Sequence, residues 1–321
     1  MRQSPFLIGL LALSVALNVY LLATRHGAPP PDTRDTVVAG EAPSAPEEDA
    51  GEAADATPPK PPASANSDWR VFKATVEHSI ARAFEQLGAE GPAVAAVYAR
   101  LFVWDLDAQQ DVLKGDRIEV VWRPTADANY DVAVARYVSG KLGKTLDAYK
   151  YLAPDDTWPS WWRADGTEVP FRLVDGPLDD YEQVTSLLKD RPTHAGMDFK
   201  TPVGTEVTAP RRGKVVQTDW NTTFNGKSVE LEYEDGVHAK FLHLDATKVK
   251  PGQAVKAGQV IGLTGNSGRS TAPHLHYQLE RGSTILDPLE YHGSSRRKLP
   301  AAALEPFKAE VQRLRTLLPA E

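Results

Sequence analysis

The stretch 270–280, which reads Ser-Thr-Ala-Pro-His-Leu-His-Tyr-Gln-Leu-Glu, constrains the fold of this chain more than any other part of it. Read as a β-strand, it has a period of two, so His274 and His276 point to one face of a sheet. Leu275 and Tyr277 then point to the other face. An apolar core would have to desolvate both imidazoles, whereas imidazole is the commonest metal ligand. The stretch therefore predicts a metal site on a β-sheet and calls for further protein ligands elsewhere in the chain.

A second segment, 193–199, offers such ligands in the order Thr-His-Ala-Gly-Met-Asp-Phe. His194 and Asp198 are four positions apart and can meet one ion if the chain turns between them, a freedom that Gly196 gives the backbone. With one histidine of the His-x-His pair they form a His/Asp/His set that leaves a fourth position open, as in a hydrolytic zinc site. The spacing leaves open whether His274 or His276 is the third ligand.

The acidity of the chain lies mainly in one segment. The formal net charge is −7, and residues 27–67 carry eight acidic and two basic side chains, so the remainder is close to neutral. No basic cluster is interleaved with aromatic residues, and we predict no nucleic-acid partner. Because the chain has no cysteine, it forms neither a disulfide framework nor a thiolate metal site.

The N-terminal region 1–26 contains an apolar run, residues 6–23, that is long enough for a short membrane helix. No A-x-A-like cleavage site follows it, so we predict an uncleaved membrane anchor. The slight excess of positive charge before the run favours an inner-membrane anchor with the catalytic domain in the periplasm. Export after cleavage of a signal peptide is the alternative.

Residues 27–67 are predicted to be a disordered linker. They are rich in Pro, Ala, Glu and Asp and nearly free of large apolar residues. Such a segment cannot bury enough surface to offset the conformational entropy lost on ordering.

Residues 68–178 are predicted to form a small α+β module. From residue 69 to about 117 apolar residues recur every three or four positions, which is typical of helices, and Gly88 and Gly91 separate two of them. The next segments alternate like strands: 116–122, 130–138, 145–151 and 169–173.

Residues 179–292 are predicted to form a mainly β domain with antiparallel strands. Its strand-like segments are separated by Asn-Gly and Asp-Gly turn signals at 225–226 and 235–236. They are 206–209, 214–218, 228–233, 239–244 and 260–264. In residues 293–321 an apolar stripe with helical spacing predicts a C-terminal helix that packs back on the body, with a partner-binding helix as the alternative. The stripe consists of Leu304, Phe307, Val311, Leu314 and Leu318.

The order of these motifs carries a family resemblance. Three motifs closely resemble those of the LytM/lysostaphin-type zinc metallopeptidases, which cut peptidoglycan cross-bridges. They are His-x-Gly-x-Asp at 194–198, Phe-Leu-His-Leu at 241–244 and Gly-x-x-Gly-x-Ser-x-x-Pro-His-Leu-His at 265–276. The match runs from about residue 193 to 288. A looser match, over about 76–178, resembles the region before the peptidase in opacity-associated-protein-type cell-wall endopeptidases. That match implies a module that positions substrate or regulates the cleft.

The resemblance also implies the roles of the site residues and the fold. It implies an antiparallel two-sheet peptidase domain of the duplicated-hybrid-motif type. One zinc ion per chain would be bound by His194, Asp198 and His276, with no other cofactor. His243 and His274 would be the catalytic histidines beside it. Strand parity places His243 on the same face as Phe241.

These expectations combine into a membrane-tethered, zinc-dependent endopeptidase. We predict that it hydrolyses peptide cross-links of bacterial peptidoglycan with a zinc-activated water assisted by histidines. Its partners would be peptidoglycan and, through the N-terminal helix, the membrane, and the sequence makes no prediction of an oligomeric state. The alternative is a catalytically silent LytM-type activator of a cell-wall amidase. Activators of that type typically lack some of the five site residues, all of which are present here.

Overall fold

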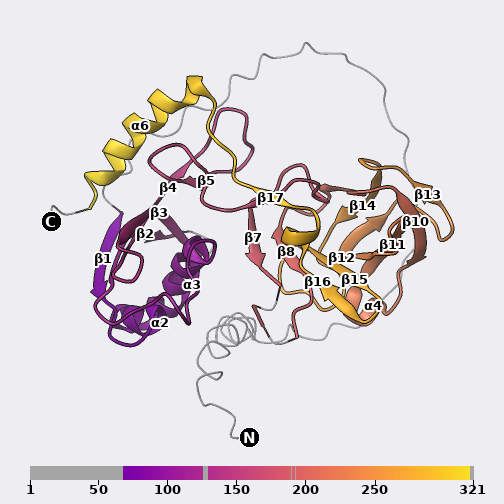
Figure 1. Ribbon diagram of the computed structural model, residues 1–321, viewed down its shortest axis with the longest axis horizontal. Helices are drawn as coiled ribbons and strands as arrows, with labels where there is room; N and C mark the ends of the chain where they lie inside the picture. The colour runs from indigo at the N-terminus through magenta and orange to yellow at the C-terminus, as the bar shows by residue number, and fades with distance from the viewer. Residues whose placement is uncertain (1–67, 126–128, 189, 192, 319–321) are drawn as a thin grey trace, which may run out of the picture.

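The computed structural model describes residues 68–318 apart from 126–128, 189 and 192. It contains a five-stranded sheet, drawn on the left of Figure 1, and a ten-stranded network on the right, and all the strand pairs within them are antiparallel. The prediction of a mainly β domain with antiparallel strands is confirmed. The predicted anchor in 1–26 and linker in 27–67 lie outside the described residues. None of the described helices has both the length and the hydropathy needed to cross a membrane.

The five-stranded sheet is covered by helices on both faces. Its strands pair in sequence order: β1 (Arg70–Thr75), β2 (Arg117–Pro124), β3 (Tyr130–Ser139), β4 (Lys144–Tyr151) and β5 (Ser160–Trp162). The helical segments before β2 are α2 (Ile80–Ala83), the 3-10 helix η1 (Phe84–Glu90) and α3 (Gly91–Phe102). They pack on one face, and α6 (Ala301–Arg315) packs on the other against β3 and β4.

The burial pattern of β3 explains why this sheet needs two covering layers. Ala135 and Tyr137 are buried in the core beneath the helices that precede β2, while Ala133 and Val134 are buried beneath α6. A strand that is buried on both faces has a nearly continuous apolar sequence instead of an alternation of apolar and polar residues.

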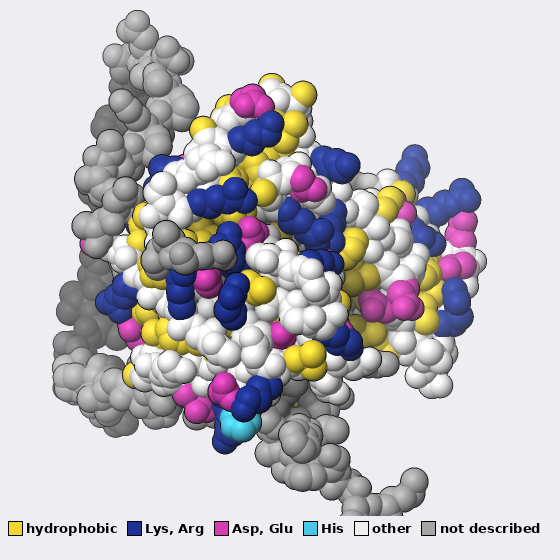
Figure 2. All heavy atoms as spheres, turned by 60° about the vertical axis from the view of Figure 1, so that its left-hand side comes forward, with side chains coloured by type: hydrophobic (Ala, Val, Ile, Leu, Met, Phe, Trp, Pro, Cys, Tyr) yellow, Lys and Arg dark blue, Asp and Glu magenta, His cyan; other side chains and the backbone are white. Residues whose placement is uncertain are grey.

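The face of the molecule turned forward in Figure 2 carries Lys and Arg side chains interspersed with Asp and Glu.

Two predictions for this region are wrong in part. The segment from residue 69 was predicted to be helical, but it begins with the edge strand β1, in which Phe72 is buried and Val71 is 42% exposed. The segment 169–173 was predicted to be a strand, but only β6 (Arg172–Leu173) is formed, paired with β17 (Ser294–Ser295). Both segments are short, and short runs carry little periodic signal.

The ten-stranded network contains the strands predicted for residues 179–292. Its members are β7 (Gln183–Ser186), β8 (Met197–Lys200), β9 (Glu206–Thr208), β10 (Gly213–Thr218), β11 (Lys227–Tyr233), β12 (His238–Thr247), β13 (Ala254–Val255), β14 (Val260–Thr264), β15 (His274–Arg281) and β16 (Thr284–Leu286). Two one-turn helices, α4 (Thr222–Asn225) and α5 (Pro288–Tyr291), lie between or after them. The strands form one branched network, not two separate sheets, because β12 pairs with β15 along its first half and with β14 along its second.

Contacts between the two sheets involve both apolar and charged side chains. Trp104, just after α3, packs partly buried against the core of each sheet. Next to it, Asp105 accepts a hydrogen bond from Arg296 at 2.9 Å. The fully buried Glu168 accepts from Arg172 and Arg297. Such a buried carboxylate is tolerated because both guanidinium groups pair with it.

His292 is buried beside the core of the network and gives a pH-dependent contribution to stability. Its Nε2 lies 2.7 Å from the hydroxyl of Tyr277, and burial, with the nearby charge of Arg211, lowers its pKa from 6.5 to about 4. The unfolded chain takes up this proton near pH 6.5 and the folded chain only near pH 4. Stability is therefore present above pH 6.5 and is lost as the pH falls towards 4.

Between pH 7 and pH 4 the titration of His292 should lower the free energy of unfolding of the unmodified chain by about 2–3 kcal/mol. We expect His292→Gln, which cannot titrate, to lack this part of the decrease. The check is the free energy of unfolding of metal-free protein at several pH values, measured by denaturant titration. Equal pH slopes for the variant and the unmodified chain would contradict the assignment.

Candidate metal centre

Two neighbouring strands bring the first two candidate ligands together. β8 and β15 are antiparallel, and their register places Asp198 directly opposite His276. Residues opposite each other in such a pair have Cβ atoms about 4.5–5.5 Å apart on the same face. The alternation predicted for β15 is present, since Leu275 and Tyr277 are fully buried in the core on the other face.

The third candidate, His194, reaches the same point from the turn before β8. Gly196 lies between it and Asp198, but not for the reason expected from the sequence, because its φ is not positive. Instead the backbone of β15 approaches it closely: a Cβ atom at Gly196 would lie 2.3 Å from the carbonyl oxygen of Tyr277 and 3.0 Å from Cε1 of His276. Glycine is therefore required by the close packing of the turn against the His276 strand.

Replacing Gly196 by Ala is expected to destabilise the fold by about 1–3 kcal/mol, as overpacking typically does, and to weaken metal binding. The added methyl group would push the turn away from β15 and so separate His194 from His276. Gly176→Ala is the matched control, because its Cβ would meet no atom closer than 3.5 Å. Thermal denaturation with and without zinc measures both effects, and equal behaviour of the two variants would contradict this role of Gly196.

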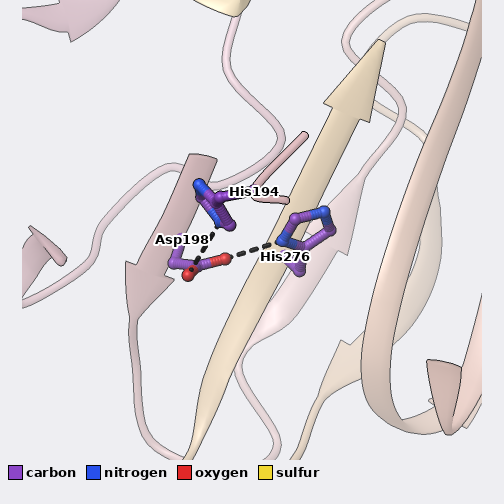
Figure 3. Close-up of side chains that lie close together, drawn as sticks. All are labelled: His194, Asp198 and His276. Atoms are coloured by element: carbon purple, nitrogen blue, oxygen red, sulfur yellow. Dashed lines mark hydrogen bonds and ion pairs between the residues drawn. The ribbon is translucent and has the colours of Figure 1, made fainter. Parts of the chain in front are cut away.

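The three side chains form a compact buried group (Figure 3). Nδ1 of His276 lies 2.7 Å from Oδ1 of Asp198, and Nε2 of His194 lies 3.0 Å from Oδ2 of the same carboxylate. Their candidate ligand atoms all lie within 4.8 Å of one another, and each residue is less than a tenth exposed.

The outer contacts of the two imidazoles show that this group suits a cation. Nδ1 of His194 lies 2.8 Å from the carbonyl oxygen of Leu187, which can only accept, so this nitrogen carries the hydrogen. Nε2 of His276 lies 3.3 Å from Oε1 of Gln278, whose amide nitrogen donates to Glu280. In the neutral rings the remaining lone pairs therefore face the carboxylate.

Lone pairs that face a carboxylate repel it unless a cation lies between them. Among the described residues, Nε2 of His194 has no hydrogen-bond partner although it is buried, which fits a metal-binding role. Two neutral imidazoles and one carboxylate with outer-shell acceptors are a donor set that zinc prefers. The residues present thus fit a zinc ion.

The charge state of Asp198 agrees with this assignment. Burial alone would raise the pKa of its carboxyl group, but hydrogen bonds and positive charge from His194 and His276, when these rings are protonated, hold this pKa well below the usual range, and a bound cation would act in the same direction. Arg191, whose side chain is 38% exposed, also contacts Oδ2 of Asp198 at 3.1 Å. The group therefore keeps a negatively charged oxygen ligand at neutral pH.

His243 and His274 lie next to this group, with ring centroids 4.7 Å apart. Nδ1 of His243 donates to the carbonyl oxygen of Ser267 at 2.9 Å, and Nδ1 of His274 donates to that of Ala272 at 2.8 Å. Each ring therefore has an unprotonated Nε2 when neutral, and Nε2 of His274 lies 3.9 Å from Asp198. Such nitrogens are able to accept a proton from a water molecule.

The environment of His243 keeps it neutral. Burial is the main cause that lowers the pKa of His243 to about 4, and repulsion from the positive charge of a protonated His274 is the second. At neutral pH its imidazole is therefore a proton acceptor and not a cation.

His243 lies at the site, but not on the same face as Phe241, so the prediction from strand parity is wrong. Phe241 is fully buried against Tyr277 on the core face, whereas His243 contacts His274 on the opposite face. Two residues that are two positions apart share a face only in an unbroken strand. The register between β11 and β12 shifts between Lys227 and Val229, and His243 has a φ of 65°, which turns its side chain to the other face.

The remaining histidines of the described residues do not join the group. His238 contacts Glu230 at 2.9 Å on the far part of β12, and His78 is exposed in the turn before α2. The outer residues Leu187, Arg191 and Gln278 were not predicted from the sequence. Of these, only Gln278 had a local signal, because it shares the strand face of His274 and His276.

Comparison with known proteins agrees with the geometry. Residues 192–288 match the family described as peptidase family M23. This segment is an M23 peptidase domain. The resemblance to LytM/lysostaphin-type metallopeptidases, expected over about 193–288, is confirmed. The looser resemblance of the upstream module stays a prediction.

Three relatives illustrate the similarity of the M23 domain and its surroundings. Peptidoglycan DD-endopeptidase ShyC of Vibrio cholerae is 29% identical over 223 residues, which cover 67% of this chain and 51% of that protein. Glycyl-glycine endopeptidase ALE-1 of Staphylococcus capitis is 44% identical over 30% of this chain and 28% of its own length. ShyA, another peptidoglycan DD-endopeptidase of Vibrio cholerae, is 32% identical over 53% of this chain and 41% of its own length. The chain thus spans about half the length of ShyC and less of the other two.

Proposed function

We propose that this chain is a zinc-dependent endopeptidase that hydrolyses peptide cross-links of bacterial peptidoglycan. The observation that carries the proposal is the convergence of His194, Asp198 and His276 beside the imidazoles of His243 and His274. The names of the relatives support the substrate class, since ShyC and ShyA are peptidoglycan DD-endopeptidases and ALE-1 is a glycyl-glycine endopeptidase.

In this proposal the five residues divide into a metal-binding set and a proton-transfer set. His194, Asp198 and His276 would hold one zinc ion, which when bound would acidify a water molecule and polarise the scissile carbonyl. Nε2 of His243 or His274 accepts the proton of the attacking water, and the imidazolium so formed donates a proton to the departing amine. The Ser267 and Ala272 carbonyls fix both rings in the orientation that this requires.

We further propose that residues 6–23 anchor the protein in the inner membrane and that the M23 domain acts in the periplasm. The apolar run and the acidic, proline-rich segment 27–67 support this arrangement. Membrane fractionation of cells that express the full chain, followed by protease access to the M23 domain in spheroplasts, is the check.

Digestion of purified cross-linked peptidoglycan by the full chain tests the main proposal. An endopeptidase converts cross-linked dimeric muropeptides into monomers, which mass spectrometry of the released fragments identifies. An amidase activator, the alternative, would release nothing alone and would release free peptides only when an amidase is added. That second pattern would contradict the proposal.

A further inference from the structure

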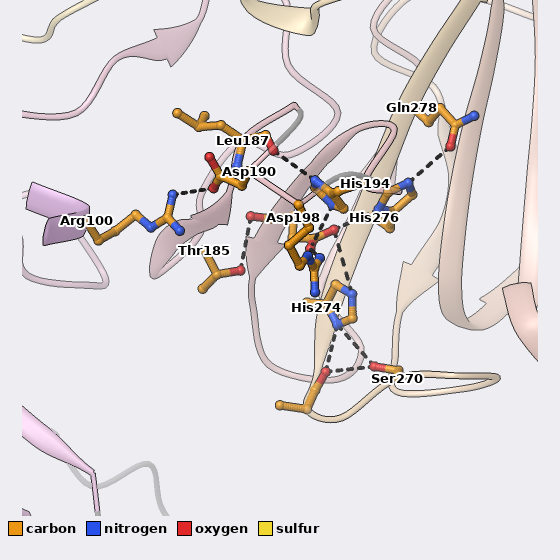
Figure 4. A network of polar contacts seen from close by, with 12 residues as sticks. Arg100, Thr185, Leu187, Asp190, His194, Asp198, Ser270, His274, His276 and Gln278 are labelled. Carbon is orange, nitrogen blue, oxygen red and sulfur yellow. Dashed lines mark hydrogen bonds and ion pairs between the residues drawn. The ribbon is translucent and has the colours of Figure 1, made fainter. Parts of the chain in front are cut away.

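Helix α3 of the upstream module contacts the segment that precedes the first candidate ligand. Nη1 of Arg100 lies 2.6 Å from Oδ2 of Asp190, and their side chains are only 27% and 22% exposed. These residues are 90 positions apart: Arg100 lies on α3, which covers the five-stranded sheet, and Asp190 lies between β7 and β8 of the ten-stranded network. Figure 4 shows the pair at one end of a polar network that includes His194, Asp198 and His276 and continues to Gln278 and His274.

The carboxylate of Asp190 connects Arg100 to the backbone of Leu187. The oxygen that accepts from Arg100, Oδ2, also accepts a hydrogen bond from the backbone N–H of Leu187 at 2.8 Å. The N–H of Asp190 donates in turn to the carbonyl oxygen of Leu187, at 3.2 Å. Leu187 is therefore held at both its N–H and its C=O by Asp190, whose own position depends on Arg100.

The same carbonyl oxygen of Leu187 is the partner of the His194 ring. It accepts from Nδ1 of His194 at 2.8 Å, which fixes the tautomer and points Nε2 at Asp198. Outer partners of this kind typically change metal affinity by 10–100-fold when they are removed. An ordinary exposed ion pair has no such connection and contributes little.

We propose that Arg100 is a positioning residue for the metal centre, acting through Asp190 and the carbonyl of Leu187 on the imidazole of His194. This inference rests on the proposed function for the identity of the metal. It assigns to the upstream module a part in forming the zinc site. The module supplies the guanidinium group of Arg100, which lies outside residues 192–288, the segment that matches the M23 family.

The experiment compares zinc dissociation constants of the full chain and of three variants, measured by competition with a chromophoric chelator. Arg100→Gln removes the cation, Asp190→Asn removes the charge but keeps an acceptor for Leu187, and the third variant combines both. We expect each single variant to bind zinc about 3–10-fold more weakly. Because the two residues act in series, the double variant should be no weaker than the weaker of the two single variants.

Two further variants separate the positioning of His194 by Arg100 from the effect of simply removing a positive charge from the upstream module. Arg100→Lys keeps the charge and should restore the affinity to within about 2-fold, since an ammonium group still pairs with a carboxylate. Lys114→Gln removes one cation from the same module, where it pairs with Glu77 at an exposed site, and should leave zinc affinity unchanged. At saturating zinc the kcat of Arg100→Gln should return to that of the unmodified chain.

The possible results are distinct. Unmodified zinc affinity in Arg100→Gln, multiplied losses in the double variant, or an equal loss in Lys114→Gln would each overturn the positioning role. Failure of the unmodified chain to cleave peptidoglycan while it binds zinc would contradict the proposed function and leave the positioning role to be decided by the affinities. Failure of the unmodified chain to bind zinc would overturn both.

Discussion

His276→Ala is expected to lower the zinc affinity of the chain by more than about 100-fold, because loss of a ligand should exceed the 10–100-fold cost of losing an outer partner. In the unmodified chain His276 faces Asp198 across the β8–β15 ladder, and Nδ1 lies 2.7 Å from the carboxylate. In the part of the chain that the structure describes, no other His, Asp or Glu joins this group of ligand atoms, and the next histidine on that face, His274, lies beside His243. Elemental analysis after dialysis against trace zinc measures the occupancy.

His238→Ala serves as the control for this measurement. His238 lies on β12, next to β15, but pairs with Glu230 outside the metal group, so this variant should keep one zinc per chain. Full occupancy in His276→Ala together with loss of zinc from His274→Ala would exchange the roles of the two histidines.

The two histidines proposed to be catalytic are expected to behave in the opposite way. His243→Ala and His274→Ala should each keep one zinc ion and lose about 10²–10⁴-fold in kcat/KM, the usual contribution of a general acid or base. The reason is that the Nδ1 atoms of both rings are held by backbone carbonyls, which leaves Nε2 of each neutral ring free to accept a proton near the metal group. Neither ring belongs to the compact group of ligand atoms formed by His194, Asp198 and His276.

Cleavage of a soluble cross-linked muropeptide, followed by chromatography, gives the rate for each variant, and zinc analysis of the same samples gives occupancy. His78→Ala, an exposed position outside the site, should cleave at the unmodified rate. A zinc-loaded His243→Ala or His274→Ala protein with an unmodified rate would show that the affected ring takes no part in proton transfer.

The candidate ligands could be predicted from the sequence because their arrangement depends on local rules. The period of two in β15 places His274 and His276 on one face, and a turn before β8 allows His194 and Asp198 to meet. The choice between His274 and His276 could not be made from spacing. It depends on the register of β8 against β15, which places Asp198 opposite His276.

The orientation of His243 was beyond sequence reasoning, although the residue was identified. Its place on the site face depends on an irregularity in the pairing of β11 with β12 and on a positive φ, which non-glycine residues seldom adopt. Periodicity assumes an unbroken strand and so predicts the wrong face. Positive φ values at such residues are held in place by the surrounding structure and cluster at functional sites.

The contact between Arg100 and Asp190 was likewise not accessible from the sequence. Each residue is an ordinary polar side chain in its own segment, on a helix and in a turn. They meet only because the upstream module packs against the M23 domain through contacts such as those of Trp104. Long-range packing of this kind leaves no periodic signal.

The most direct test of the account is the rate at which metal-free protein removes cross-links from purified peptidoglycan as zinc is added. The full chain is first treated with a chelator and dialysed, and the remaining cross-linked dimers are then quantified at each zinc concentration. We expect no loss of cross-links without metal, a rate that rises in proportion to added zinc, and a plateau at one zinc per chain. An undiminished rate in the metal-free protein, or intact cross-links at one zinc per chain, would contradict the assignment of this site as the centre of a zinc endopeptidase.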